Sequence, residues 1–226
     1  MTIKINNVTK RFKKKEIFKE FNYEFEKGKT YVILGDNGVG KSVLLKLLCG
    51  YSVCDKGEIT IDDITLGRDF DFLQNAGISI NSPNFISYMS GLDNLLMIAS
   101  IRKICNKKDI LNLAHTFEMS DEINRLYKKY SLGTKQKLRL IQVLMENPEY
   151  LILDEPFNGL DKKVKRIFIE ILKKEQELNK TIFITSHYME EIMHLDCEVL
   201  ELTHNHLQKV AVIKNEKLIS IGDELD

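Results

Sequence analysis

Residues 35–42 read Gly35-Asp36-Asn37-Gly38-Val39-Gly40-Lys41-Ser42, a run that fits the pattern G-x-x-x-x-G-K-[ST]. An apolar segment, Thr30–Leu34, precedes this run and is expected to be a buried strand, and the leucines of Lys41–Cys49 follow it with helical spacing. Between a strand and a helix, such glycines let backbone N–H groups surround phosphate oxygens, and the helix N-terminus adds its positive end. The alternative explanation is a glycine-rich turn that binds no ligand, and the strand before the run and the helix after it disfavour this alternative. The sequence therefore predicts a nucleoside triphosphate site over Gly35 to Val43.

Two acids follow a second apolar segment, Tyr150–Leu153. Asp154, at the end of that expected strand, is placed to hold Mg²⁺ together with the hydroxyl of Ser42, while Lys41 reaches the β- and γ-phosphates. Glu155, the next residue, is placed to accept the proton of an attacking water as general base. A helix cap or an ordinary turn is the alternative explanation of the two acids, and the phosphate loop earlier in the chain favours the catalytic one.

The 226 residues suit a single domain. Alternating strand and helix patterns predict an α/β fold with a mainly parallel sheet, and the first strands, Thr2–Val8 and Phe21–Phe25, predict an antiparallel portion at the N-terminus. Gly91–Glu146 has no strand pattern, so a helical lobe inserted at about residues 82–147 is expected. Other strands are expected at Glu58–Ile61, Ala76–Ile80, Thr181–Thr185 and as a pair within Glu198–Ile213, and other helices at Leu138–Met145, Val164–Leu172 and Tyr188–His194.

Charge and composition disfavour several classes of function. Lysine plus arginine is 33 and aspartate plus glutamate is 33, so the zero net charge gives no general attraction to nucleic acid or to an anionic membrane. There is no apolar run long enough to cross a bilayer and no hydrophobic signal segment, which predicts a chain that does not span the membrane. The cysteines have no C-x-x-C spacing and are expected to be reduced thiols. A metal site is disfavoured in a group of potential ligands that flanks an expected hairpin turn: His194, Cys197, His204 and His206.

Three motifs in a fixed order make the sequence similar to a known family. Tyr130–Gln136 stands before the strand that ends in Asp154, and Asn158–Asp161 follows the two acids. With Thr185–His187 one strand further on, this order resembles the nucleotide-binding domain of ABC transporters, which has a signature sequence before the second acidic motif and a switch histidine after it. Phe12 stands where that family has the aromatic residue that stacks on adenine. The resemblance covers nearly the whole chain and implies a P-loop NTPase fold.

This resemblance assigns roles that composition and spacing do not. It implies that ATP and Mg²⁺ are the cofactors and that two ATPase subunits, identical or paired, meet head to tail around two ATP molecules. Ser131 and Gly133 would contact the γ-phosphate held by the other subunit, and Asp161 would report across the interface. His187 would bridge the γ-phosphate and Glu155. Taken singly, Ser131 and Asp161 are better explained as helix N-caps and His187 as a structural histidine, but their joint order favours the family roles.

Two residues depart from the family pattern. Leu132 replaces the first glycine of the signature pair, whereas Gly133 is retained. The family glutamine that follows a strand in this region corresponds to Asn81, which carries the same amide on a side chain one methylene shorter. Direct contact of Asn81 with Mg²⁺ or the attacking water is expected to be weaker, and slow catalysis or a bridging water are the two open outcomes. Gln74 is a poor substitute because it stands before the expected strand.

The resemblance implies an ATP-hydrolysing subunit of an ABC transporter at the cytoplasmic face of a cell membrane, working with a separate transmembrane permease subunit. The form of the signature favours export of a drug, a peptide or a bacteriocin-like compound. Contact with the permease is expected near Asn81–Asn94, whose apolar residues are either exposed anchors or core residues: Phe85, Ile86, Tyr88 and Met89. A soluble ABC-type ATPase acting on nucleic acid or ribosomes is the alternative, and zero net charge disfavours it. A P-loop kinase is disfavoured because no arginine for a lid stands between Arg68 and Arg102.

Overall fold

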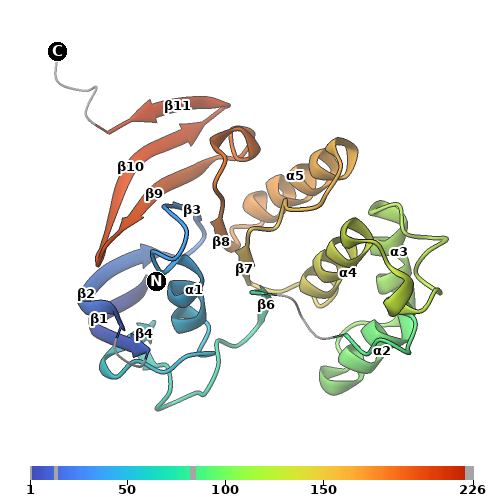
Figure 1. Cartoon of the computed structure of the whole chain (residues 1–226), viewed down its shortest axis with the longest axis horizontal. Coiled ribbons are helices and arrows are strands. Elements are labelled where there is room, and N and C mark those ends of the chain that lie inside the picture. Colours follow the sequence, from blue (N-terminus) through green and yellow to red (C-terminus); the bar gives the residue numbers. More distant parts are fainter. Residues whose placement is uncertain (1, 13–14, 82–84, 222–226) are drawn as a thin grey trace.

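The computed structural model describes residues 2–12, 15–81 and 85–221. Its strands form two sheets, and helices pack on both faces of the larger one (Figure 1). The pairings of the smaller sheet are all antiparallel, which confirms the antiparallel portion expected at the N-terminal end. Its strand order is β2 (Lys15–Glu26), β1 (Thr2–Phe12), β4 (Lys56–Ile61) and β5 (Ile64–Thr65).

The larger sheet is parallel over most of its width, as expected. The strands from β9 to β6 run parallel, and β10 and β11 continue the sheet with antiparallel pairings. Parallel strands end at the same edge of a sheet, so the segments that follow β3, β7 and β8 meet there. The strand order is β11 (Lys217–Ser220), β10 (His206–Lys214), β9 (Cys197–Thr203), β3 (Thr30–Leu34), β8 (Thr181–Thr185), β7 (Tyr150–Asp154) and β6 (Ala76–Ser79).

The helices divide into two groups. Among the described residues, one α-helix follows β3 and another connects β7 to β8. Three α-helices lie between β6 and β7 and gather at the end of the molecule away from β1 and β2 (Figure 1). Gly91–Glu146 is described throughout and contains no strand; its one isolated bridge joins Leu126 to Ser90, just before this segment. The helices are α1 (Lys41–Leu48), α2 (Gly91–Arg102), α3 (Lys107–Thr116), α4 (Leu132–Leu144) and α5 (Lys162–Glu177).

Alternate residues of the central strands enter different cores. In β7, Leu151 and Leu153 join the core that α4 and α5 cover, whereas Tyr150 and Ile152 join the core that contains α1 and the smaller sheet. All four side chains are buried. A strand covered on both faces has no polar side, which explains why the sequence of β7 reads as an uninterrupted apolar run.

The helix expected over Tyr188–His194 was a wrong prediction. The structure has only a 3-10 turn at Met189–Glu191. Ser186 explains the difference, because its hydroxyl accepts from Tyr188 N at 3.1 Å and donates to Glu191 Oε2 at 3.0 Å. These local side-chain hydrogen bonds stabilise a turn conformation, which competes with the conformation needed to start an α-helix.

Candidate nucleotide site

The loop from Gly35 to Gly40 connects β3 to α1, as the motif predicts. Gly35 and Gly40 have φ angles of 145° and 121°. A Cβ atom at Gly35 would lie 2.4 Å from the carbonyl oxygen of Leu202, and one at Gly40 would lie 2.9 Å from Ile17 Cγ2. Both positions therefore require glycine. Gly40 is the N-cap of α1 and brings no capping side chain, so the first N–H groups of this helix are available to an external anion.

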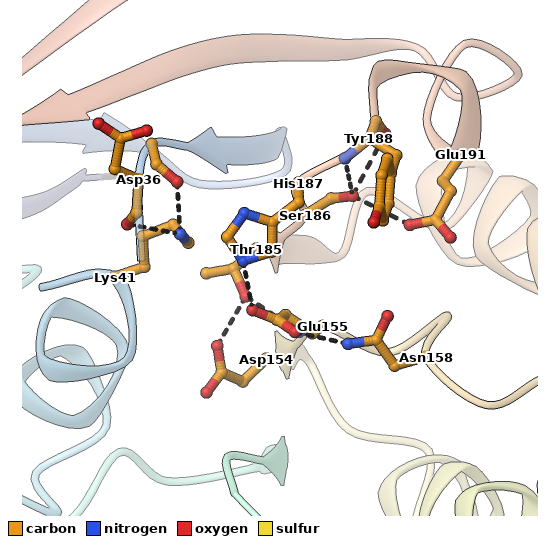
Figure 2. Close-up of polar contacts among 11 residues, drawn as sticks. Asp36, Lys41, Asp154, Glu155, Asn158, Thr185, Ser186, His187, Tyr188 and Glu191 are labelled. Carbon is orange, nitrogen blue, oxygen red and sulfur yellow. Dashed lines mark hydrogen bonds and ion pairs between the residues drawn. The ribbon is translucent and has the colours of Figure 1, made fainter. Parts of the chain in front are cut away.

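Lys41 lies at the mouth of this loop. Its Nζ atom donates to the carbonyl oxygens of Gly35 at 2.6 Å and Asp36 at 3.1 Å (Figure 2). Burial lowers the pKa of Lys41, while the charges of three nearby acids, Glu155, Asp154 and Asp36, act in the opposite direction. A cation held by uncharged carbonyl groups in a partly desolvated position is suited to receive a phosphate. Ser42 and Val43 follow in the first turn of α1 and are half-buried.

The two acids predicted after β7 are joined through Thr185 of β8. Asp154 and Thr185 are register partners in the parallel pairing of β7 with β8. Thr185 Oγ1 donates to Asp154 Oδ1 at 2.7 Å, and the backbone N–H of Glu155 donates to the same Oγ1 at 2.9 Å. The Glu155 backbone has a φ angle of 48°, which is uncommon for a residue with a side chain.

The Glu155 carboxylate is held from two sides. A hydrogen bond of 2.8 Å joins Glu155 Oε1 to His187 Nε2, and Asn158 Nδ2 donates to Glu155 Oε2. In Figure 2 His187 lies between Lys41 and Glu155, and Asn158 approaches the carboxylate from the side away from Lys41. Both carboxylate oxygens thus have a donor, while the site stays open because Glu155 and His187 remain partly exposed.

The structure brings four predicted residues together at one edge of the sheet: Lys41, Asp154, Glu155 and His187. The cluster combines a cation for phosphate, a carboxylate for a metal, and a carboxylate with a histidine for proton transfer. The hydroxyl of Ser42 and the carboxylate of Asp154 are hard oxygen ligands of the kind that Mg²⁺ prefers. The donor set therefore fits Mg²⁺ together with a nucleoside triphosphate.

The signature residues lie elsewhere in the molecule. Ser131 and Gly133 stand at the start of α4, which Figure 1 places well away from α1. Ser131 Oγ caps α4 by accepting from Thr134 N at 3.1 Å. A Cβ at Gly133 would come within 2.8 Å of the carbonyl oxygen of Gly159, so a glycine is required there. Leu132, which replaces the other family glycine, is 70% exposed.

Asp161 is also a helix cap. Its Oδ1 atom accepts from the backbone N–H groups of Lys163 at 2.9 Å and Val164 at 3.0 Å, at the start of α5. The bond from Val164 is the main reason that the pKa of Asp161 lies below its ordinary value. The capping explanations of Ser131 and Asp161 therefore hold as structural facts, and a cap of this kind leaves room for a further ligand.

Phe12 and Asn81 lie at the rims of the two sheets. Phe12 ends β1 and is 47% exposed, with the ammonium group of Lys10 at 5.1 Å from the ring centroid. Asn81 follows β6, is exposed and has a φ angle of 58°. Asparagine is one of the few residues that adopts this left-handed conformation readily, which gives a local physical reason for the shorter amide side chain. Gln74 precedes β6 and donates to the carbonyl oxygen of Phe72.

Four apolar residues were expected near a permease contact, either as exposed anchors or as core residues. The structure contains both kinds. Phe85 belongs to the core and is buried, whereas Tyr88 is 73% exposed. Ile86 and Met89 are half-buried. Asn94 fixes this segment because its buried side chain binds both the N–H and the carbonyl group of Ile86. Tyr88 therefore remains as the candidate anchor.

The potential metal ligands near the C-terminal end lie in different surroundings. His194 Nδ1 lies 3.0 Å from Glu216 Oε1, and Cys197 is buried at the start of β9. His204 stands in the turn between β9 and β10, and His206 begins β10. Within residues 2–12, 15–81 and 85–221, no group of three or more His, Cys, Asp or Glu residues is arranged to hold a metal ion.

Residues 18–158 match the protein family described as ABC transporter. The chain is 35% identical over 206 residues to the uncharacterized ABC transporter ATP-binding protein YybJ of Bacillus subtilis (strain 168), with 91% of this chain and 94% of YybJ covered. It is 33% identical over 195 residues to the lantibiotic transport ATP-binding protein SrtF of Streptococcus pyogenes, with 85% and 83% covered. The dimeric ATP-binding cassette MJ0796, solved in a post-hydrolysis state bound to ADP and Pi, has a TM-score of 0.79 and 22% identity, over 92% of this chain and 98% of that one.

These matches define the class as an α/β ATPase with the P-loop NTPase fold of ATP-binding cassettes. The chain belongs to the ABC transporter family, as an ATP-binding subunit that hydrolyses ATP. In the part of the chain that the structure describes, every helix is too short or too polar to pass through a membrane.

Three contacts at the site were missed by sequence reasoning. Thr185 accepts from the backbone N–H of Glu155, and Asn158 donates to the Glu155 carboxylate. Gln136 of the signature donates to the carbonyl oxygen of Pro156 at 2.8 Å. All three lie within motifs quoted from the sequence. The contacts of Thr185 and Gln136 depend on which strand and loop lie next to each other, and that of Asn158 depends on the conformation of the loop after β7. No local pattern gives that information.

Proposed function

We propose that this ATPase powers export of a drug, a peptide or a bacteriocin-like compound, as part of a dimer that closes around two MgATP. The observation that carries the proposal is the 2.8 Å contact between Glu155 and His187, close to Lys41 and Asp154. A base next to a histidine at the edge of a phosphate loop is suited to activate water against a γ-phosphate.

Each residue of the cluster has a role in this proposal. Gly35 to Val43 would surround the β- and γ-phosphates with backbone N–H groups, and Lys41 would exchange its carbonyl partners for phosphate oxygens. Glu155 would accept the proton of the attacking water, while His187 would hold Glu155 and the γ-phosphate in line. Phe12, which is exposed at the end of β1, would stack on the adenine.

Mg²⁺, when bound, neutralises charge on the β- and γ-phosphates. Ser42 and Asp154 are the residues that would hold it. Asn81 would act near the same ion, and its exposed side chain makes a bridging water the more direct route.

The dimer would complete the site from outside. Ser131 and Gly133 lie apart from the phosphate loop of their own chain, so in this proposal a second subunit would present its equivalents to the γ-phosphate. Asp161 and Ser131 already orient the starts of α5 and α4, and a helix N-terminus attracts an anion. This is the support for a head-to-tail arrangement with two shared nucleotides, by two copies of this chain or by this chain with a paired ATPase.

Export through a separate permease at the inner face of the cell membrane is supported by a named relative. SrtF is a lantibiotic transport protein, and the exposed Tyr88 offers a contact for the cytoplasmic part of a permease. The coupling would then run from the closing dimer, through the helices around α2, to the membrane subunit.

The test is the solution mass of Glu155→Gln measured by light scattering on a sizing column, with and without MgATP. Removing the base should prevent hydrolysis and trap the closed state, so the mass should double with MgATP and remain that of a monomer with MgADP.

The matched control is the double variant Glu155→Gln, Lys41→Ala, which lacks the cation for the phosphates. It should stay monomeric under every condition. A monomer of Glu155→Gln that still binds MgATP would rule out a dimer of two copies of this chain and leave only pairing with a different ATPase. Undiminished hydrolysis by Glu155→Gln would contradict the proposed base.

A further inference from the structure

Thr185 has a position that no other side chain of the site shares. It ends β8, it is fully buried, and it stands directly beside Asp154 in the neighbouring strand. Its single hydroxyl group makes two bonds, to Asp154 Oδ1 at 2.7 Å and from the backbone N–H of Glu155 at 2.9 Å. An amide N–H can only donate, so the one hydroxyl proton must go to the Asp154 carboxylate. The direction of both bonds is therefore fixed.

The backbone of Glu155 needs such a bond. With a φ angle of 48°, this residue is in a left-handed conformation that a side chain disfavours and that persists only when its surroundings hold it. The bond to Thr185 holds the N–H group of this peptide, and His187 and Asn158 hold the carboxylate at the other end of the residue. The direction of the Glu155 side chain thus depends on Thr185 at the backbone.

We propose that Thr185 is a positioning residue that fixes Asp154 and Glu155 relative to each other and to His187. The inference rests on the proposed function, in which Asp154 holds Mg²⁺ and Glu155 is the base. One hydroxyl ties both acids to β8, and the same strand leads into His187 two residues later (Figure 2). Thr185 occupies one of the acceptor sites of Asp154 Oδ1, so the carboxylate would still have acceptor sites with which to hold the metal.

The experiment compares two pairs of side chains at position 185, Thr with Val and Ser with Ala. The members of each pair differ mainly in the hydroxyl group. Thr185→Val keeps the shape of threonine without the hydroxyl, and Thr185→Ser keeps the hydroxyl, with Thr185→Ala as the partner of the serine variant. In the full-length protein, kcat and KM for ATP are measured together with the affinity for a fluorescent ATP analogue, in Mg²⁺ and in EDTA. The thermal unfolding midpoint is recorded for each variant.

The hydroxyl should determine activity within each pair. Loss of a group that orients a metal ligand commonly costs about 10–100-fold in metal affinity or activity, so kcat should fall by that factor from Thr to Val and from Ser to Ala. The affinity gained on adding Mg²⁺ should shrink in the same two variants, while binding in EDTA should be unchanged. Thr185→Ser should resemble the unchanged protein.

Two results would overturn the inference. One is a kcat that is equal within each pair, and the other is a kcat that follows the unfolding midpoint whether or not the hydroxyl is present. If Thr185→Val does not fold, the serine and alanine pair decides alone. The proposed function is tested separately, by the mass and the ATP hydrolysis of Glu155→Gln, and neither measurement depends on residue 185.

Discussion

Ser131 has a role in its own chain that is independent of any nucleotide. Its hydroxyl accepts from Thr134 N and so satisfies one of the unpaired N–H groups at the start of α4. The same hydroxyl is proposed to meet the γ-phosphate held by another subunit. A variant without the hydroxyl would lose both contacts at once. A substitution is therefore needed that keeps the helix cap and changes only the interaction with phosphate.

Ser131→Asp meets that need, because aspartate is as good an N-cap as serine. In the Glu155→Gln background, Ser131→Asp should keep the thermal unfolding midpoint but lose the dimer formed with MgATP, because its carboxylate repels the phosphate. Ser131→Ala should lose about 1 kcal/mol of unfolding free energy as well. Calorimetry and the sizing-column mass check the two effects, and a stable dimer of Ser131→Asp would disprove the proposed phosphate contact.

Local sequence patterns predicted the backbone of the site better than its side-chain network. The loop around Lys41 and the strand before Asp154 were predicted because glycine spacing and apolar runs are local signals. The bond from Thr185 to Asp154 was missed because it depends on β7 lying beside β8, and these strands are joined only through α5. Asn81 was recognised as a departure, but its left-handed backbone, which explains the residue, has no sequence signature.

At the scale of elements, α4 and the loop after β7 behave as one unit. The buried side chain of Gln136 in α4 donates to the carbonyl oxygen of Pro156, and Arg139 Nη1 donates to Gln136 Oε1 at 3.0 Å. Gly133 approaches Gly159 so closely that a Cβ would not fit. Because the same loop begins with Glu155 and ends with Asp161, we expect a displacement of α4 to affect both residues.

Gln136→Ala should destabilise the protein by about 1–3 kcal/mol, because it leaves a buried carbonyl oxygen without its donor. Urea unfolding followed by circular dichroism measures the loss. The neighbouring variant Lys137→Ala is the control and should stay within about 0.5 kcal/mol of the unchanged protein. An equally small effect of Gln136→Ala would mean that α4 and the loop are held together by apolar packing alone.

At the scale of the whole molecule, the sheet separates two cores, and each contains one buried cysteine. Cys49 lies in the core with α1, and Cys197 lies in the core covered by α4 and α5. Burial raises the pKa of the Cys49 thiol to about 11 and that of the Cys197 thiol to about 12. The unfolded thiols ionise near 9.0, so the unfolded chain releases protons that the folded chain keeps. The free energy of unfolding should therefore fall as the pH rises from about 9 towards 11–12.

Thiol titration with a chromogenic disulfide at about pH 8 follows both cores at once. Cys54 and Cys105 are partly exposed and should react in the native protein, whereas Cys49 and Cys197 should react only after unfolding. If the molecule unfolds as one unit, these two should become reactive at the same urea concentration. Cys49→Ala and Cys197→Ala identify each signal, and reaction of one thiol well before the other would show that the two cores open separately.

The alternation of β7 between the two cores limits how this protein can change in length. A deletion of one residue within this short strand would exchange Leu151 and Leu153 with Tyr150 and Ile152 across the sheet, and would turn Asp154 away from its partner in β8. Neighbouring side chains can repack around a single substitution. A shift of the whole strand, however, disturbs both cores and the edge of the sheet that carries Asp154 and Glu155. Insertions and deletions should therefore be tolerated in exposed turns that make no contact with the site, while the central strands keep a fixed length.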